Sequence, residues 1–170
     1  SNVKLISLVM FIYYIGWGIS ETFVNIYFKE ILGSYTALGI VSALLPLFGI
    51  IWALLAASFE DRIHKNKLIS SILLLYIPIS FIILALRSFF SFVAFRFYHA
   101  FLATNLWLSS ETFLRKYAKN KPAEAIGLFD SAYGLSLIIG PVIGGYLISK
   151  YSYSIFYTIS FFAFIAFLAS

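Results

Sequence analysis

Six long apolar stretches constrain this chain more than any other feature of its sequence. A helix needs about 20 mostly apolar residues to cross roughly 30 Å of hydrocarbon. The sequence provides such a length six times, with short polar breaks in between: Leu5–Phe28, Ala37–Phe59, Lys67–Leu86, Phe89–Phe113, Glu124–Ile148 and Tyr153–Ala169. We therefore predict an all-α membrane protein, a bundle of six transmembrane helices with almost no soluble part.

Composition supports this fold class and excludes several functions. Charged residues make up 11% of the chain, whereas a soluble domain carries about 25%. The chain has no cysteine and only two histidines, and it lacks His-Glu-x-x-His and Gly-x-Ser-x-Gly motifs. We therefore expect no disulfide, no metal site, no cofactor and no enzymatic activity. The net charge of +5 is interpreted as a signal of membrane orientation, with no nucleic-acid partner.

Lysine and arginine are unevenly distributed over the breaks between the predicted spans. One side would hold eight of them, and the other side only Lys29, Arg87 and Lys150. The positive-inside rule then places the N-terminus in the cytoplasm of a multi-pass protein in the cell (inner or plasma) membrane. The eight are Lys4, Arg62, Lys65, Lys67, Arg115, Lys116, Lys119 and Lys121.

An internal repeat relates the first predicted span to the fourth. Residues 11–27 match residues 101–117 at an offset of 90, with seven identities in seventeen positions. The run Ser-Glu-Thr-Phe occurs in both, at Ser20–Phe23 and Ser110–Phe113. Chance is the alternative in so aromatic a chain. Because the two spans would cross in opposite directions, the match predicts two inverted three-helix repeats, an arrangement typical of secondary transporters.

Ionisable residues inside the spans gather in the first and fourth. A charge at membrane depth costs about 2.5–3.5 kcal/mol on insertion scales, so it usually faces a cavity or a partner. Glu21 and Arg96 each lie about seven residues from the outer end of their span, roughly 10 Å deep at 1.5 Å per residue. We therefore expect a Glu21–Arg96 ion pair across a cavity. The predicted substrate and proton cavity comprises Tyr14, Trp17, Glu21, Asn25, Arg96, His99, Asn105 and Trp107.

Glu21 is the strongest functional candidate, because a carboxyl at this depth suits the binding and release of a proton during transport. For the other predicted cavity residues, a purely structural role is the alternative. The Arg96 side chain could extend to the outer interface, and His99 could hydrogen-bond a neighbouring helix. The aromatic side chains could serve packing alone. Glu111 is expected to be a solvated or loop-anchoring charge near Arg115.

Three short motifs carry a family resemblance. The loop after the second span holds Asp61, Arg62 and Lys65 in the spacing of a Gly-x-x-x-Asp-Arg-x-Gly-Arg-Arg/Lys signature, with Ala57 and His64 in place of glycines. The second motif is Arg96 in the fourth span, where related exporters show Arg-x-x-Gln-Gly. The third motif lies in the fifth span and follows Gly-x8-Gly-x3-Gly-Pro-x2-Gly-Gly, with Ser136 replacing one glycine. It comprises Gly127, Ser136, Gly140, Pro141, Gly144 and Gly145.

With its six spans, the chain resembles the N-terminal half of a major facilitator superfamily transporter, and its motifs are most similar to those of drug/proton antiporters. The resemblance implies rocker-switch alternating access, with the first and fourth spans lining the cavity and the signature loop latching the two halves. Residues 1–170 would form one domain. Since the sequence starts with Ser1 and ends after the sixth span, we expect a fragment or separately expressed half that lacks the C-terminal half. Its partner would be that six-helix half or a second copy.

The leading hypothesis is therefore half of a secondary active transporter that moves a small organic solute, driven by protons. A drug or metabolite exporter is slightly favoured. The alternative within the superfamily is a sugar or organic-acid symporter. An alternative of another class is a non-transporting membrane assembly or receptor subunit built on the same fold.

Overall fold

A computed structural model describes residues 2–59, 65–118 and 121–170, and every element among them is a helix. Long helices dominate because apolar side chains surround nearly every turn, and in lipid the backbone groups must be satisfied within the segment. The elements are α1 (Asn2–Leu32), α2 (Tyr35–Phe59), α3 (Lys65–Tyr76), α4 (Ile79–Ala85), α5 (Phe89–Tyr117), α6 (Pro122–Tyr151), the 3₁₀ helix η2 (Ser152–Phe156) and α7 (Tyr157–Ala169).

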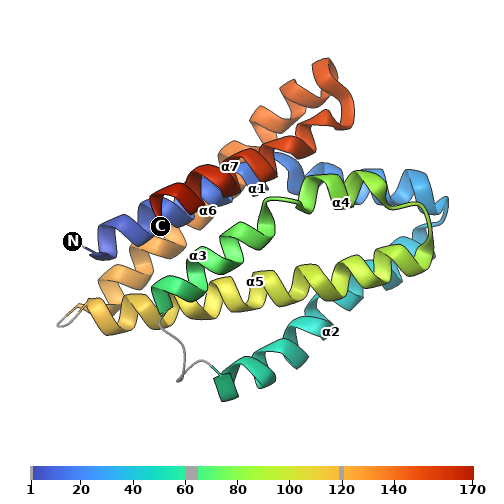
Figure 1. Ribbon diagram of the computed structural model, residues 1–170. Helices are drawn as coiled ribbons and strands as arrows, with labels where there is room; N and C mark the ends of the chain where they lie inside the picture. Colours follow the sequence, from blue (N-terminus) through green and yellow to red (C-terminus); the bar gives the residue numbers. More distant parts are fainter. Residues whose placement is uncertain (1, 60–64, 119–120) are drawn as a thin grey trace.

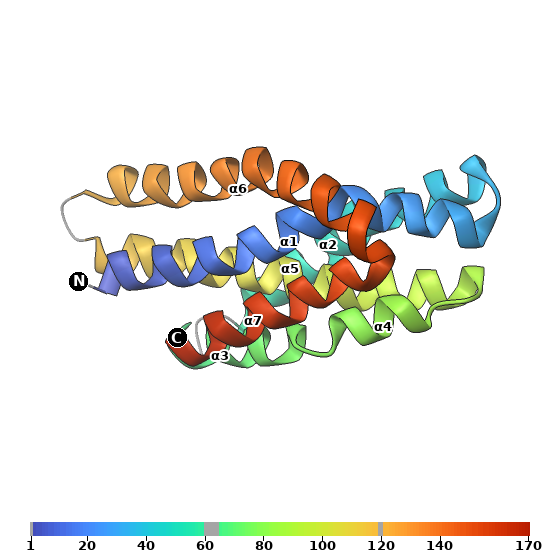
Figure 2. The same cartoon turned by 90° about the horizontal axis from the view of Figure 1, so that it is seen from above.

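The helices form a bundle in which α1 occupies a central position. It packs mainly against α6 and α7, whereas α2 packs mainly against α5. Figures 1 and 2 show α1 running beside α6 and α7, with both chain termini at the same end of the bundle. In Figure 1, α2 lies at the side of α5 that faces away from α6 and α7. The core is strongly aromatic, and its largest fully buried side chains include Phe28, Tyr76, Phe92, Phe129 and Phe156.

The predicted third span, Lys67–Leu86, is not one continuous helix. It is divided into α3 and α4 at Ile77 and Pro78. Proline has no backbone N–H and disfavours the helical conformation of the residue before it. Accordingly, the Ile77 N–H donates to the Leu74 carbonyl oxygen at 3.2 Å, which is an i→i−3 turn. Pro46 and Pro141, by contrast, are accommodated inside α2 and α6.

Side chains of α7 satisfy the backbone where α4 begins. The Ser80 N–H donates to Ser160 Oγ at 3.4 Å, and the Ser160 N–H donates to Ser80 Oγ at 3.3 Å. The Ser80 hydroxyl also donates to the Phe156 carbonyl oxygen. The predicted sixth span is likewise interrupted, because its first residues form η2 before α7 starts at Tyr157. Hydroxyl groups thus replace helical hydrogen bonds at both interruptions.

Four stretches of the described chain are long and apolar enough to cross a membrane: Val3–Leu32, Tyr35–Ala56, Lys67–Ala85 and Pro122–Ala169. The last of these joins α6, η2 and α7, and α5 is not among the four. The α5 helix contains four charged residues that lower its apolar character: Arg96, Glu111, Arg115 and Lys116. The all-α membrane architecture is confirmed, whereas the count of six crossings stays a prediction.

Candidate functional site

The helices form an open cavity of about 440 Å³, within the range of small-molecule sites. Five elements, α1, α2, α3, α5 and α6, contribute to its walls. Five of the eight predicted cavity residues line it: Tyr14, Trp17, Glu21, His99 and Trp107. Its other lining residues are Tyr13, Leu45, Pro46, Gly49, Tyr76, Ala100, Ala103, Thr104, Leu106, Leu108 and Tyr133.

Aromatic rings form a large part of the cavity wall and contact one another across helices. The Tyr14 ring of α1 lies edge-on to Tyr133 of α6, with centroids 4.8 Å apart, and to Trp107 of α5, at 6.3 Å. Trp107 and Tyr133 are 5.4 Å apart, which closes the triangle. Such edge-to-face pairs each add about 0.5–1.5 kcal/mol beyond area burial. They fix the orientation of the ring faces at the cavity.

Glu21 is the carboxylate of this wall, and Trp17 connects it to His99. Trp17 lies one turn before Glu21 on α1, and both side chains line the cavity. The Trp17 ring also packs on the His99 imidazole, with centroids 4.5 Å apart. His99 is only 3% exposed, and its Nδ1 has no hydrogen-bond partner within the described part of the chain. A buried polar atom without a partner at a cavity wall is suited to a bound ligand.

The predicted Glu21–Arg96 ion pair is not among the ion pairs of the described residues. Instead, Arg96 Nη2 donates to Asn25 Oδ1 at 3.1 Å, and its guanidinium lies over the Phe28 ring, 4.9 Å from the centroid. Arg96 is 4% exposed, so its side chain does not extend to the surface. The partner of its guanidinium is thus an amide rather than the carboxylate, and the predicted depth of Arg96 in the membrane stays a prediction.

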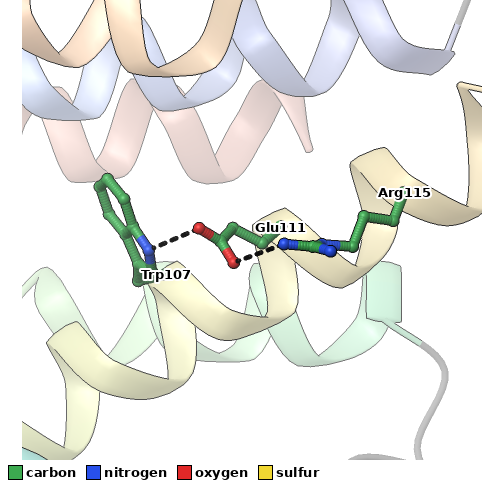
Figure 3. Close-up of polar contacts among 3 residues, drawn as sticks. All are labelled: Trp107, Glu111 and Arg115. Carbon is green, nitrogen blue, oxygen red and sulfur yellow. Dashed lines mark hydrogen bonds and ion pairs between the residues drawn. The ribbon is translucent and has the colours of Figure 1, made fainter. Parts of the chain in front are cut away.

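Glu111 has a more specific role than the solvated charge expected from the sequence. Its carboxylate accepts a hydrogen bond from Trp107 Nε1 at 3.0 Å and lies 3.8 Å from Arg115 Nη2. Figure 3 shows the three side chains in a row along α5, with Glu111 in the middle. The Glu111 side chain is 27% exposed. Because the indole N–H is bound to Glu111, the Trp107 ring is held in place at the cavity wall.

The sequence missed three cavity tyrosines, and two amides that it predicted at the cavity, Asn25 and Asn105, do not line it. Tyr13, Tyr76 and Tyr133 line the cavity, but the chain has twelve tyrosines and nothing in their spacing distinguished these three. Asn105 was expected at the cavity. Its side chain instead donates to the Phe101 carbonyl oxygen of its own helix at 2.8 Å.

A family model described as Major Facilitator Superfamily matches residues 6–170 of the chain. The chain belongs to the major facilitator superfamily. This membership makes it a multi-pass membrane protein of a transporter family, in agreement with its long apolar helices. A comparison with curated proteins found no match.

The glycine motif of this superfamily member lies along the contact between α6 and α1. A Cβ atom placed on Gly140 would lie 2.7 Å from the Gly18 carbonyl oxygen, and one on Gly144 would meet the backbone of Ile19. A Cβ on Gly18 would lie 2.6 Å from the Ser136 carbonyl oxygen. The backbones of α1 and α6 therefore approach closely through small residues.

The remaining members of the motif do not take part in this contact. A Cβ atom added at Gly127 or Gly145 would meet nothing within 4 Å. Pro141 is accommodated inside α6. In the predicted conformational signature loop, Asp61 and Arg62 lie outside the described residues, and so does the Lys65 side chain. The role of that loop stays a prediction.

Proposed function

We propose that this superfamily member is a secondary active transporter that moves a small organic solute by alternating access, with Glu21 as its proton-coupling group. The observation that carries the proposal is the position of Glu21, which lines a cavity while lying within the apolar stretch Val3–Leu32. Ionisable residues at membrane depth are costly and usually serve ion or substrate pathways. A carboxyl that alternates between its charged and neutral forms can bind and release a proton as access changes.

The helices around the cavity support a binding site that can change shape. The cavity combines a predominantly aromatic wall with a few polar groups, which is the usual composition of small-molecule sites. The α1–α6 contact at Gly18, Gly140 and Gly144 brings one cavity helix against a helix with an internal proline. Small residues at such contacts allow helices to slide with little steric change. In this proposal the cytoplasm holds the N-terminus, and a second six-helix half or a second copy completes the transport path.

Export of a drug or metabolite is the form of transport that we favour over symport of a sugar. Sugars are bound through many hydrogen bonds, and the two candidate amides, Asn25 and Asn105, do not line the cavity. The wall instead offers mainly aromatic and aliphatic surface, with one carboxylate, one imidazole and the hydroxyl-bearing side chains of four tyrosines and Thr104. Organic-acid symport would place a negative substrate beside Glu21, an arrangement that repels unless Glu21 is protonated.

To test this proposal, the full-length protein is reconstituted in proteoliposomes and a pH gradient is imposed. Accumulation of labelled small organic solutes of positive, zero and negative charge is then followed. The wild-type protein is expected to accumulate solute in proportion to the gradient, and Glu21→Gln to lose this dependence. Glu30→Gln is the matched control, because it makes the same change at an exposed position of α1. Unchanged proton-coupled flux in Glu21→Gln would remove Glu21 from the mechanism. Absence of gradient-driven accumulation in the wild type would favour a non-transporting subunit.

A further inference from the structure

We infer that the cavity binds an organic ammonium ion, meaning a protonated amine on an aromatic or branched apolar body. This inference rests on the proposed function in that it names the substrate class of the same cavity. It is derived from three features of the wall: its charge, its ring faces and one unpartnered imidazole nitrogen. Each of them concerns ligand chemistry and is independent of the direction of transport.

The charge of the wall favours a cation. Glu21 is the acidic residue that lines the cavity, and no lysine or arginine of the described residues lines it. Arg96 does not line it: its guanidinium is bound to Asn25 and lies over Phe28, although its charge is close enough to act on Glu21 and His99. An anion at this wall would meet a carboxylate directly, whereas the nearest basic side chain, Arg96, lies behind the wall and is already bound to Asn25. An ammonium ion would be attracted to the carboxylate.

The aromatic faces favour a cation with an apolar body. Tyrosine and tryptophan carry negative charge density on their ring faces, and a cation over such a face gains about 0.5–2 kcal/mol. Tyr14, Trp107 and Tyr133 contact one another edge-on at one part of the wall. Trp17 lies one helical turn from Glu21 at another part of the wall. The same cavity thus offers apolar surface for a hydrocarbon body and several rings that stabilise its positive head.

His99 distinguishes an ammonium ion from a purely hydrophobic cation. Its Nδ1 is buried without a partner among the described residues, and its ring contacts Trp17, the neighbour of Glu21. In the neutral tautomer that carries its proton on Nε2, Nδ1 is an acceptor. Because this nitrogen is fully buried, the His99 ring must reorient slightly in the inferred complex before the N–H groups of a protonated amine can donate both to it and to the Glu21 carboxylate. A bound amine would therefore satisfy a buried atom that the protein itself leaves unpaired.

The test compares three ligands that share one aromatic body and differ in the charge of the head group. They are phenethylammonium, 2-phenylethanol and phenylacetate. Equilibrium binding of each to the full-length protein is measured in detergent at neutral pH without any gradient. We expect phenethylammonium to bind at least about tenfold more tightly than 2-phenylethanol, with phenylacetate the weakest. Glu21→Gln should lower the affinity for the ammonium ion by about tenfold and change that for the alcohol little. Glu30→Gln should bind all three ligands as the wild type does.

Binding of 2-phenylethanol by Glu21→Gln serves as the test of folding, because it depends on the aromatic wall and not on the charge. Equal affinities for the three ligands, or a preference for phenylacetate, would overturn the inference. An ammonium affinity unchanged by Glu21→Gln would do so as well. Since no gradient is present, the result is separate from transport. Gradient-driven transport of a neutral or anionic solute would leave the proposed function standing while this inference fails. Ammonium binding without transport would leave this inference standing while the proposed function fails.

Discussion

Arg96 Nη2 of α5 donates a hydrogen bond to Asn25 Oδ1 of α1 at 3.1 Å. This contact joins the two helices that the sequence repeat relates to each other. The Arg96 Nε atom has no hydrogen-bond partner within the described residues, and the side chain is 4% exposed. The guanidinium is thus held by one amide and by the Phe28 ring, with an added electrostatic attraction to Glu21. A buried charge with so few partners should be sensitive to the loss of any of them.

The first prediction concerns this amide. Asn25→Leu removes the acceptor and should lower the stability of the folded protein by about 1.5–3 kcal/mol, the range for hydrogen bonds to charged groups. Asn25→Asp is the matched control, because it keeps an oxygen acceptor and should retain wild-type stability or exceed it. The measurement is thermal unfolding of the full-length protein in detergent. Equal unfolding temperatures for wild type and Asn25→Leu would show that the guanidinium finds another partner.

A second prediction addresses the contact between α1 and α6. In Gly140→Ala the new methyl group would lie 2.7 Å from the Gly18 carbonyl oxygen, so the helices must separate, at a cost of about 1–3 kcal/mol. Gly145→Ala makes the same change where a Cβ meets nothing within 4 Å. It should be neutral or slightly stabilising, since alanine favours helix by about 1 kcal/mol over glycine. Thermal unfolding separates the two variants. A Gly140→Ala protein as stable as Gly145→Ala would mean that the helices do not need this close approach.

Much of the architecture follows from features that the sequence displays locally. Long apolar stretches set the helices, and the glycine spacing in the fifth stretch identified Gly140 and Gly144, which do contact α1. The cavity position of Glu21 also followed, because a carboxyl inside an apolar helix has few alternatives. In each case the physical constraint acts within one helix or at a fixed depth, so no knowledge of the partner helix was required.

The remaining features depend on partners that are distant in the sequence. Pro78 interrupts its helix whereas Pro46 does not, and the freed Ser80 N–H is bound by Ser160, eighty residues away. Similarly, the sequence placed Arg96 opposite the first span, but whether its guanidinium bonds to Asn25 or to Glu21 depends on how α5 is rotated against α1. Helix rotation is set by side-chain packing, which one sequence does not reveal.

The third prediction tests the serine pair that joins α4 to α7. Ser80→Ala and Ser160→Ala should each destabilise the protein by about 1–3 kcal/mol, because each leaves a buried N–H of the other helix without its acceptor. Their hydroxyls also bond to each other at 2.5 Å. The double variant should therefore lose less than the sum of the two single changes, by about 0.5–3 kcal/mol. Ser149→Ala is the control, because its exposed hydroxyl donates to the Tyr146 carbonyl oxygen within its own helix, α6. Strict additivity of the two changes would mean that the serines do not act as a unit.

The last prediction joins the proposed coupling to the inferred substrate. If Glu21 takes either a proton or an organic ammonium ion, the two compete, because a protonated carboxyl no longer attracts a cation. The affinity for phenethylammonium should then fall as the pH is lowered, at most tenfold per pH unit for one competing proton. His99 lines the same cavity, and its protonation would also repel the cation. Glu21→Gln separates the two effects, since any pH dependence that persists in it belongs to His99. The measurement is a set of phenethylammonium binding isotherms for the wild type and for Glu21→Gln across the acidic pH range. An identical pH dependence in wild type and Glu21→Gln would show that proton and substrate do not share this carboxyl, and antiport would then require a different coupling group.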